Sequence, residues 1–364
     1  MIRVFLDDAG SAPVLPEVAA ALRDVPTGNA SSPHTEGRAA RGALDRARDL
    51  AAEALGASRT EITFVSSGTE AINLAILGAL GGVGGPLVTW AAEHQSVLGA
   101  ARGAQVQGRP VVIGPVDGDA AVDLDAIVPG TALVSIGLAN NEVGTVQPVV
   151  EAIRRAHDAG ALVHVDACAG PRWMAIPAGA DLVSISGHKL GAGRGGLLYV
   201  RDGVRVEPLL FGGPQEWGRR AGHEDVASAV AVATALSVTS QQRDARTATA
   251  RRQSDRLRQA LNELGATLTG SQDRLPNFAS GFFGGRKGED MLLALDLAGL
   301  AASSGSACAS GSLDPSHVLL AMGLSLEQSL GSLRLTTGYA TTDAEIDRAV
   351  EILHRVLART PSHA

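Results

Sequence analysis

Short apolar runs alternate with helical patterns between residues 40 and 200, and this alternation constrains the fold more than any other feature. The runs have the length and composition of buried strands and lie at residues 61–65, 87–90, 111–113, 132–136, 161–165, 182–185 and 197–200. Helical patterns such as 41–55 and 69–80 separate most of them. This order is typical of a mainly parallel sheet with helices on both faces. We therefore predict an α/β fold.

Proteins with such sheets bind their ligands at the carboxyl ends of the strands, where helix N-termini also attract anions. Three predicted strands are followed there by anion-binding or reactive groups: the turn Ser66-Ser67-Gly68-Thr69-Glu70, the carboxylate of Asp166, and Ser186 with His188 and Lys189. A phosphate cup, a carboxylate and a lysine match the needs of pyridoxal 5′-phosphate (PLP). The cup binds the phosphate, the carboxylate keeps the pyridine nitrogen protonated, and the lysine forms a Schiff base. An ordinary loop lysine is the alternative for Lys189 taken alone.

The run Gly191-Ala-Gly-Arg-Gly-Gly196 satisfies G-x-G-x-x-G, the dinucleotide-binding pattern. That pattern should follow a strand directly and open a helix, whereas here an apolar strand pattern follows it. We interpret these glycines as packing around the lysine loop and predict no nicotinamide site.

Composition excludes several classes of function. The formal net charge of −7 offers no basic surface for nucleic acid. No stretch approaches the length of a membrane span, and the first residues lack the apolar core of a signal peptide, so we expect a cytoplasmic protein. The two cysteines, Cys168 and Cys308, are expected to be free thiols, and with scattered histidines they give no metal-binding spacing.

The pattern changes after residue 226, where a long helical region continues to about 264. Strands and short helices follow, and the capping box Thr342-Asp-Ala-Glu345 opens a final helix. We predict a large domain at 14–235 and a smaller α/β domain at 236–364 that includes residues 1–13.

The small domain contains Ser303-Ser-Gly-Ser-Ala-Cys308-Ala-Ser-Gly-Ser312, a polar, glycine-containing loop. Such loops are usually accessible, whereas structural cysteines lie among apolar neighbours. Cys308 is therefore a candidate nucleophile, with an incidental surface cysteine as the alternative.

These residues resemble the cysteine desulfurases of the class V aminotransferase family, which are fold type I PLP enzymes. The similarity covers nearly the whole chain. It rests on the segments Gly28–His34, Gly37-Arg38, Ser67–Glu70, Glu93-His94, Asn140–Gly144, His164–Asp166, Ser186–Lys189 and Ser304–Cys308, and on Arg334. The uninterrupted Cys308 loop is similar to that of the long-loop, NifS/IscS-like branch.

The resemblance implies a role for each matching residue. Lys189 would hold PLP and move a proton, His94 would stack on the ring and assist proton transfer, and Asp166 would pair with the pyridine nitrogen. Four residues would hold the phosphate: Gly68, Thr69, Ser186 and His188. Arg334 would bind the substrate carboxylate, with Asn141 beside it between substrate and cofactor. Cys308 would attack the sulfur of substrate L-cysteine, keep it as a persulfide and pass it to an acceptor protein or enzyme.

Two of the expected cofactor contacts depart from the family pattern. The family usually has a glutamine three residues after the aspartate, bonded to the phenolic oxygen of PLP, where this chain has Ala169. A threonine that reaches the partner subunit's phosphate in the family is replaced by His223. Because imidazole can also donate to phosphate, shared sites in a homodimer remain the expectation.

We therefore predict a PLP-dependent cysteine desulfurase that converts L-cysteine to L-alanine. Two alternatives remain open on the sequence. One is a related carbon–sulfur or selenocysteine lyase, or another class V activity. The other is a sulfur carrier that keeps the fold but little catalysis.

Overall fold

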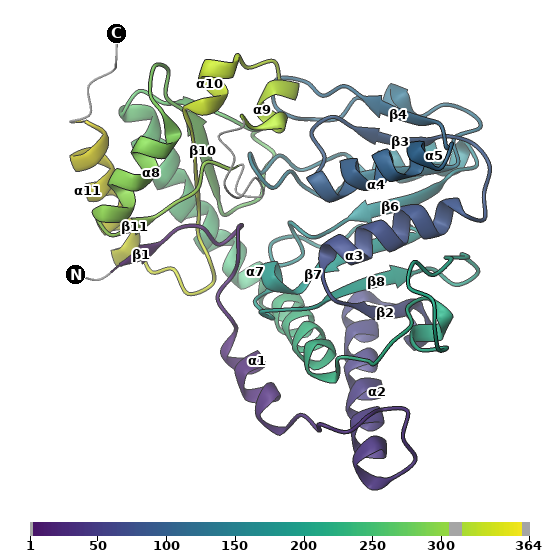
Figure 1. Cartoon of the computed structure of the whole chain (residues 1–364). Helices are drawn as coiled ribbons and strands as arrows, with labels where there is room; N and C mark the ends of the chain where they lie inside the picture. The colour runs from purple at the N-terminus through teal and green to yellow at the C-terminus, as the bar shows by residue number, and fades with distance from the viewer. Residues whose placement is uncertain (1–2, 306–314, 359–364) are drawn as a thin grey trace.

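The largest element of the computed structural model, which describes residues 3–305 and 315–358, is a seven-stranded sheet (Figure 1). In spatial order its strands are β2 (Ile62–Val65), β8 (Gly196–Val200), β7 (Leu182–Ser186), β6 (Leu162–Asp166), β5 (Leu133–Gly137), β3 (Leu87–Trp90) and β4 (Val111–Gly114). Neighbouring strands from β7 to β4 are parallel, whereas β8 is antiparallel to both β7 and β2. The predicted mainly parallel sheet is confirmed.

Helices cover both faces of this sheet because successive side chains of a strand point to opposite sides. Apolar residues such as Val134 and Val183 pack with helices α2 (Thr35–Leu55), α5 (Val149–Asp158) and the first half of α7 (Val226–Glu263). Leu133 and Leu182, their neighbours in sequence, pack on the opposite face with α3 (Gly68–Asn73) and α4 (Gln95–Val106). The pattern predicts one helix at 69–80, but α3 is followed by a π-helical turn, η3 (Leu74–Gly78).

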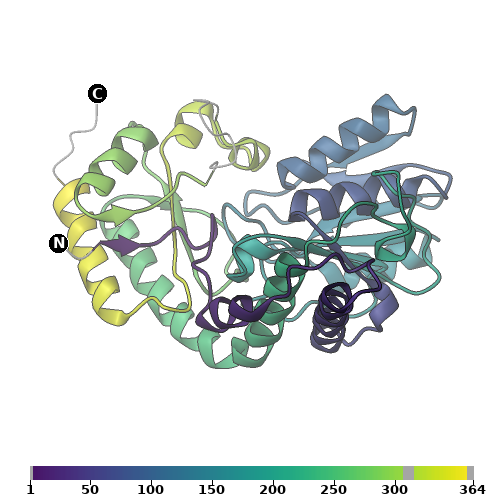
Figure 2. The same cartoon turned by 60° about the horizontal axis from the view of Figure 1, so that its bottom comes forward.

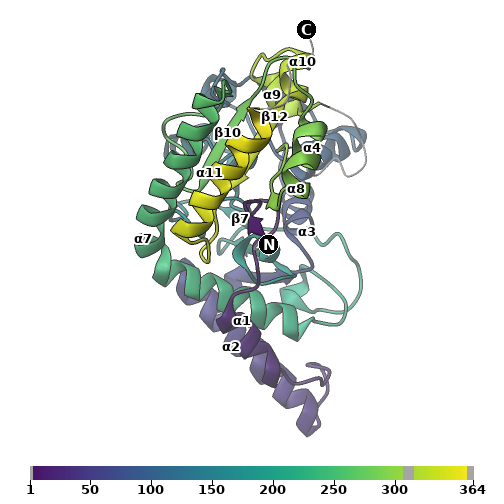
Figure 3. The ribbon, with the colours of Figure 1, turned by 90° about the vertical axis from the view of Figure 1, so that its left-hand side faces the viewer.

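A second group of elements forms around a separate apolar cluster. Its strands are β9 (Thr267–Leu268), β10 (Phe278–Phe282) and β12 (Ser332–Thr336), which form an antiparallel sheet, and the parallel pair β1 (Val4–Phe5) and β11 (Leu300–Ala301). The helices α8 (Gly288–Leu297) and α11 (Asp343–Leu357) pack against these strands together with the end of α7. Figure 3 shows α7 and α11 side by side along β10. The predicted capping box is present, since Thr342 and Glu345 each bond the other's backbone N–H.

Helix α7 joins the two groups without a break (Figures 1 and 2). Its N-terminal half, including Val232 and Leu236, packs against the large sheet, whereas Leu257 and Leu261 belong to the cluster of the small sheet. The boundary between residues 235 and 236 therefore falls inside one continuous helix, and the division into two domains at that point stays a prediction.

Short elements complete the described chain: helices α1 (Pro16–Ala21), α6 (Gly187–Leu190), α9 (His317–Ala321) and α10 (Leu326–Leu330), and the 3₁₀ turns η1 (Leu22–Asp24), η2 (Arg59–Glu61), η4 (Leu124–Ala126) and η5 (Glu216–Gly218). Across residues 3–305 and 315–358, none of the helices has the length and apolar character needed to cross a membrane.

Candidate active site

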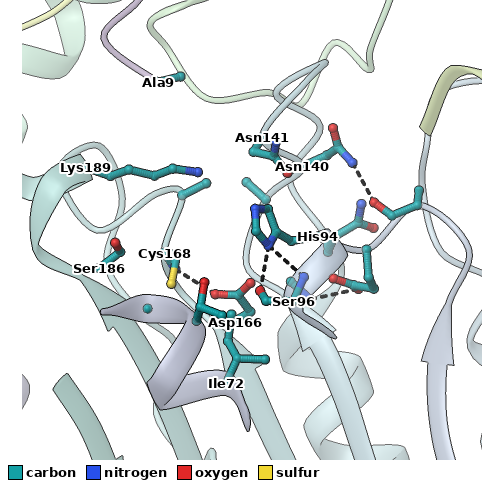
Figure 4. A pocket seen from close by; sticks show the side chains of 18 of the residues that line it. Ala9, Ile72, His94, Ser96, Asn140, Asn141, Asp166, Cys168, Ser186 and Lys189 are labelled. Carbon is teal, nitrogen blue, oxygen red and sulfur yellow. Dashed lines mark hydrogen bonds between the residues drawn. The ribbon is translucent and has the colours of Figure 1, made fainter. Parts of the chain in front are cut away.

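A cavity of about 240 Å³ opens at the carboxyl ends of β5, β6 and β7. Nine of the residues predicted from the sequence line it: Gly68, Thr69, His94, Asn141, Asp166, Ser186, His188, Lys189 and Arg334. These residues come from both the large sheet and the small one, since Arg334 lies on β12. Figure 4 shows Lys189 and His94 pointing into the cavity, with Asp166 at its floor.

Lys189 is positioned by the tight turn between β7 and α6. Gly187 allows that turn, because a Cβ at this residue would lie 2.1 Å from the carbonyl oxygen of Arg194. Gly196 is the first residue of β8, and a Cβ there would lie 2.5 Å from the carbonyl carbon of Ser67. The contacts thus support the interpretation of residues 191–196 as packing around the lysine loop.

The first turn of α3 meets the end of β7 at one corner of the cavity. Ser67 caps α3 by accepting a hydrogen bond from the backbone N–H of Glu70 at 3.2 Å. A Cβ on Gly68 would lie 2.6 Å from Cys168 Sγ and 2.9 Å from Ser186 Cβ, so only glycine fits there. Ser186 Oγ is 2.8 Å from His188 Nδ1. Hydroxyl, imidazole and the helix N-terminus therefore converge, which suits a phosphate.

Asp166 is buried at the end of β6, and its Oδ1 accepts two hydrogen bonds. The donors are the backbone N–H of Cys168 and the hydroxyl of Ser184, each at 3.0 Å. Burial opposes the ionisation of Asp166, but attraction to His94 and the contacts with Cys168 outweigh it and leave the pKa below its ordinary value. The carboxylate is therefore held as an anion at the floor of the cavity.

His94 is the N-cap of α4, and the fold fixes its tautomer. Its Nδ1 accepts the backbone N–H of Ser96 at 3.1 Å, so the ring proton of a neutral imidazole lies on Nε2. Burial, and then the charge of Lys189, lower the pKa of His94 to about 4. His94 is therefore neutral near pH 7, with its one ring proton on Nε2.

Arg334 is 2% exposed and held by three acceptors. Its Nη1 donates to the carbonyl oxygens of Asn141 at 2.7 Å and Gly305 at 3.4 Å, and its Nη2 donates to Asp7 Oδ1 at 2.7 Å. Asp7 was missed by the sequence reasoning because its partner lies 327 positions away, and no local pattern reveals such a pair.

Two predicted site residues are not among the described residues that line this cavity. His223 is exposed and outside its lining, which leaves its expected role toward a partner subunit a prediction. Cys308 lies outside the described residues. The residues on either side of residues 306–314 meet at Glu142: Ser316 donates a hydrogen bond to its Oε2, and Glu142 packs against Gly305, which lines the cavity.

The position of the usual family glutamine is also part of the cavity wall. Ala169 lines the cavity with no side chain able to donate a hydrogen bond. Cys168 lies beside it, in contact with Asp166 and near Gly68. Burial, and then the charge of Asp166, raise the pKa of the Cys168 thiol well above its ordinary value, so this thiol stays protonated.

Together these features define a PLP-binding α/β protein of fold type I: a lysine at the strand end, an aspartate on the cavity floor, and a helix N-terminus beside a serine and a histidine. The aminotransferase class-V family model matches residues 4–349, and the chain belongs to this family, among its cysteine desulfurases.

Curated relatives and a solved structure are similar to this chain over nearly its full length. The chain is 40% identical to a cysteine desulfurase of Trichormus azollae, over 98% of this chain and 93% of the relative. It is 41% identical to one from Gluconacetobacter diazotrophicus, over 99% of this chain and 94% of the relative. The solved structure of a NifS-like protein superposes with a TM-score of 0.91 at 29% identity, covering 99% of this chain and all of that one.

The residues present fit PLP. Gly68 leaves room where a Cβ would collide with Cys168 and Ser186, next to the donors expected to bind the phosphate. The backbone N–H of Cys168 and the hydroxyl of Ser184 both bond Oδ1 of Asp166, so neither of them occupies Oδ2, which a pyridine N–H could reach. Lys189 lines the same cavity.

Proposed function

We propose that this chain is a PLP-dependent cysteine desulfurase that converts L-cysteine to L-alanine and keeps the sulfur as a persulfide on Cys308. The observation that carries the proposal is the single cavity in which Lys189, Asp166, His94 and Arg334 meet. Full-length similarity to cysteine desulfurases supports the choice of substrate.

Bound PLP supplies an electron sink that weakens the bonds at Cα of the substrate amino acid. Lys189 would hold the cofactor covalently through Nζ and then carry the proton removed from Cα. Asp166 Oδ2 would accept the pyridine N–H in a charge-assisted hydrogen bond. Gly68 and Thr69 at the N-terminus of α3, with Ser186 and His188, would hold the phosphate.

Arg334 is placed to bind the substrate carboxylate. Three of its N–H groups already have acceptors, which fixes the plane of the guanidinium before substrate arrives. The remaining N–H groups would pair with the carboxylate, and Asn141 beside them would contact both substrate and cofactor. Neutral His94 would stack on the ring, and its Nε2 proton would be the one available to assist proton transfer.

The transfer of sulfur from the substrate needs one protein thiol. The Cys308 thiolate would attack the sulfur of substrate cysteine, the carbon–sulfur bond would break, and Cys308 would keep both sulfurs as a persulfide. The former substrate carbon would gain a proton and leave as alanine. Gly305, three residues before Cys308, lines the cavity, and this proximity supports the assignment.

Mass spectrometry of the cysteine-treated holoenzyme tests cofactor, substrate and nucleophile together. We expect alanine and enzyme persulfide in equal amounts, with the added sulfur on the Cys308 peptide. The peptide containing Cys168 should be unmodified, because burial keeps that thiol protonated. Lys189→Ala should lose the visible absorbance of bound PLP, and Cys308→Ala should form no persulfide. Full alanine production by Cys308→Ala would refute the assignment of the nucleophile.

We further propose a homodimer in which His223 donates to the phosphate of the partner's cofactor. The segment before His223 exposes large apolar side chains, with Phe211 87% and Trp217 49% exposed. Light scattering should give twice the chain mass, and Phe211→Asp should shift the protein toward monomer. A wild-type mass of one chain would refute the dimer.

We propose a cytoplasmic location and a protein or biosynthetic enzyme as sulfur acceptor.

A further inference from the structure

A row of buried polar side chains lies outside the cavity and is joined to Asp166 by hydrogen bonds. It consists of Ser135, His164 and Ser184, none of which lines the cavity. We propose that this row is a chain of hydrogen-bond donors that keeps Asp166 ionised, so that the proton shared with the PLP pyridine nitrogen stays on the nitrogen. The inference rests on the proposed function, since it concerns the residue that would pair with PLP.

The row is continuous across three neighbouring strands. Ser135 Oγ on β5 lies 2.9 Å from His164 Nδ1 on β6. His164 Nε2 lies 3.2 Å from Ser184 Oγ on β7, and this hydroxyl donates to Asp166 Oδ1 at 3.0 Å. All three distances are within the range of hydrogen bonds in proteins.

The strand register produces this row. Ser135 lies directly opposite His164, and Ser184 lies directly opposite Asp166. His164 and Asp166 are two residues apart, so their side chains are on the same face of the sheet and the remaining bond is the diagonal from His164 to Ser184. Each polar residue of the row stands between apolar residues that pack on the opposite face with α2 and α7.

The number of protons on each group fixes the direction of hydrogen-bond donation along the row. The Asp166 carboxylate can only accept, so the single hydroxyl proton of Ser184 points toward Oδ1. Ser184 Oγ must then accept from His164, which places the ring proton on Nε2. Nδ1 is left to accept the hydroxyl proton of Ser135. Burial lowers the pKa of His164 to about 4, so one proton on the ring near pH 7 agrees with this arrangement.

Three aligned donors affect the position of the proton shared by Asp166 and PLP. A carboxylate that accepts hydrogen bonds is a weaker base, because those bonds stabilise its charged form. Oδ1 receives a second bond from the backbone N–H of Cys168 at 3.0 Å. In a site shielded from water, an ion pair competes with a neutral pair in which the carboxylate takes the proton. Stabilising the Asp166 anion favours the ion pair, and only the protonated ring is a full electron sink.

A purely structural role would satisfy the same buried polar groups without moving that proton. The two roles differ in the ¹⁵N chemical shift of the pyridine nitrogen, which reports its protonation. The experiment uses holoenzyme reconstituted with ¹⁵N-labelled PLP, with alanine formation measured in parallel. We expect Ser184→Ala to move the shift toward that of neutral pyridine and to lower kcat about tenfold, the effect of one bond to a charged group.

Three further variants sharpen the test. Ser184→Thr keeps the hydroxyl and should retain the wild-type shift. Ser135→Ala removes the most distant donor and should give a smaller change in the same direction. Thr89→Val is the matched control: Thr89 is buried on β3 of the same sheet, its hydroxyl has no partner in the described part of the chain, and its loss should leave the shift unchanged.

A wild-type ¹⁵N chemical shift in Ser184→Ala would overturn the inference. A change in Ser184→Thr as large as that in Ser184→Ala would also overturn it. If Ser184→Ala does not fold or bind PLP, the decision passes to Ser135→Ala, for which an unchanged shift overturns the inference. The proposed function is tested separately, on the wild type. PLP binding and alanine formation with no effect of the variants would refute the donor row alone, whereas a wild type that binds no PLP would refute both.

Discussion

The buried ion pair between Arg48 and Glu216 gives a sharp prediction about the segment that leads to the proposed dimer contact. Both side chains are 3% exposed, and two parallel bonds of 2.7 Å join them. Arg48 also donates to the carbonyl of Ile62 at 2.7 Å, and Glu216 accepts the backbone N–H of Phe64 at 2.8 Å. One carboxylate therefore satisfies a guanidinium and a strand N–H.

The same pair holds a backbone that departs from the common conformations. Glu216 and Trp217 have φ of 48° and 62°, in the left-handed region that non-glycine residues rarely adopt. Such conformations cost about 1–3 kcal/mol each and persist only where surrounding contacts enforce them. The Trp217 ring lies 5.3 Å from the Arg48 guanidinium, which adds to the enforcement.

Glu216→Gln keeps the shape but leaves the Arg48 charge buried without a counter-charge. Removing one partner of a buried pair costs about 3–5 kcal/mol, and we expect a loss of this size in the free energy of unfolding. In Arg48→Met/Glu216→Leu, no charge is stranded. Ile62 keeps a bond from Trp217 Nε1, so the main cost is the unpaired N–H of Phe64, about 1–3 kcal/mol.

Urea unfolding followed by circular dichroism measures all three proteins, and light scattering reports the dimer. The single variant should unfold at lower urea than the double variant and should also dimerise more weakly. A loss below about 1 kcal/mol for Glu216→Gln, or a double variant less stable than the single one, would refute the reasoning.

Three further predictions concern the cavity. Gly68→Ala should weaken PLP binding about tenfold or more in an absorbance titration, since overpacking against Cys168 costs about 1–3 kcal/mol, whereas Gly84→Ala, with nothing near its Cβ, should bind normally. Burial raises the pKa of Glu93 to about 8 from 4.5, so between these values the folded protein keeps a proton that the unfolded chain releases, and wild-type stability falls as the pH rises from 4.5 to 8. The urea midpoint of Glu93→Gln should therefore rise relative to that of the wild type across this pH range. Midpoints of the two proteins that change in parallel with pH would contradict the prediction. With its pKa lowered to about 4, first by burial, His94 should show constant imidazole NMR signals from about pH 8 to pH 6 in cofactor-free protein, and a titration there would be contradictory.

Much of the large sheet could be predicted because its signals are local. All seven predicted strand positions of the large sheet coincide with observed strands to within a residue or two, since each run is apolar and bounded by polar or glycine-containing turns. The residues at the strand ends were predictable for the same reason. Parallel strands bring their carboxyl ends to one edge, so Asp166 and Lys189 had to lie near each other once the sheet was assumed.

Pairs formed across the fold left no such signal. Arg48 and Glu216 are 168 positions apart, and Ser135 meets His164 only through the register of β5 and β6. The π-helical turn after α3 was predicted as regular helix because its composition is ordinary helical composition. The role of Ser184 was hidden by its neighbour Ser186, which lies on the same strand face and has the more recognisable motif.

Arg334 shows how the two sheets share one site. It stands on β12 of the small sheet, it donates to Asn141 beyond the end of β5 in the large sheet, and Asp7 follows β1 from the start of the chain. A buried guanidinium without a counter-charge would be strongly destabilising, so Asp7 allows Arg334 to be buried before substrate is present. In the proposed role of Arg334, a substrate carboxylate would enter a site whose charge is already balanced, and affinity would come from the unused N–H groups and their fixed geometry. Under this proposal, substrate recognition would depend on the packing of β1 and β12 as much as on Arg334 itself.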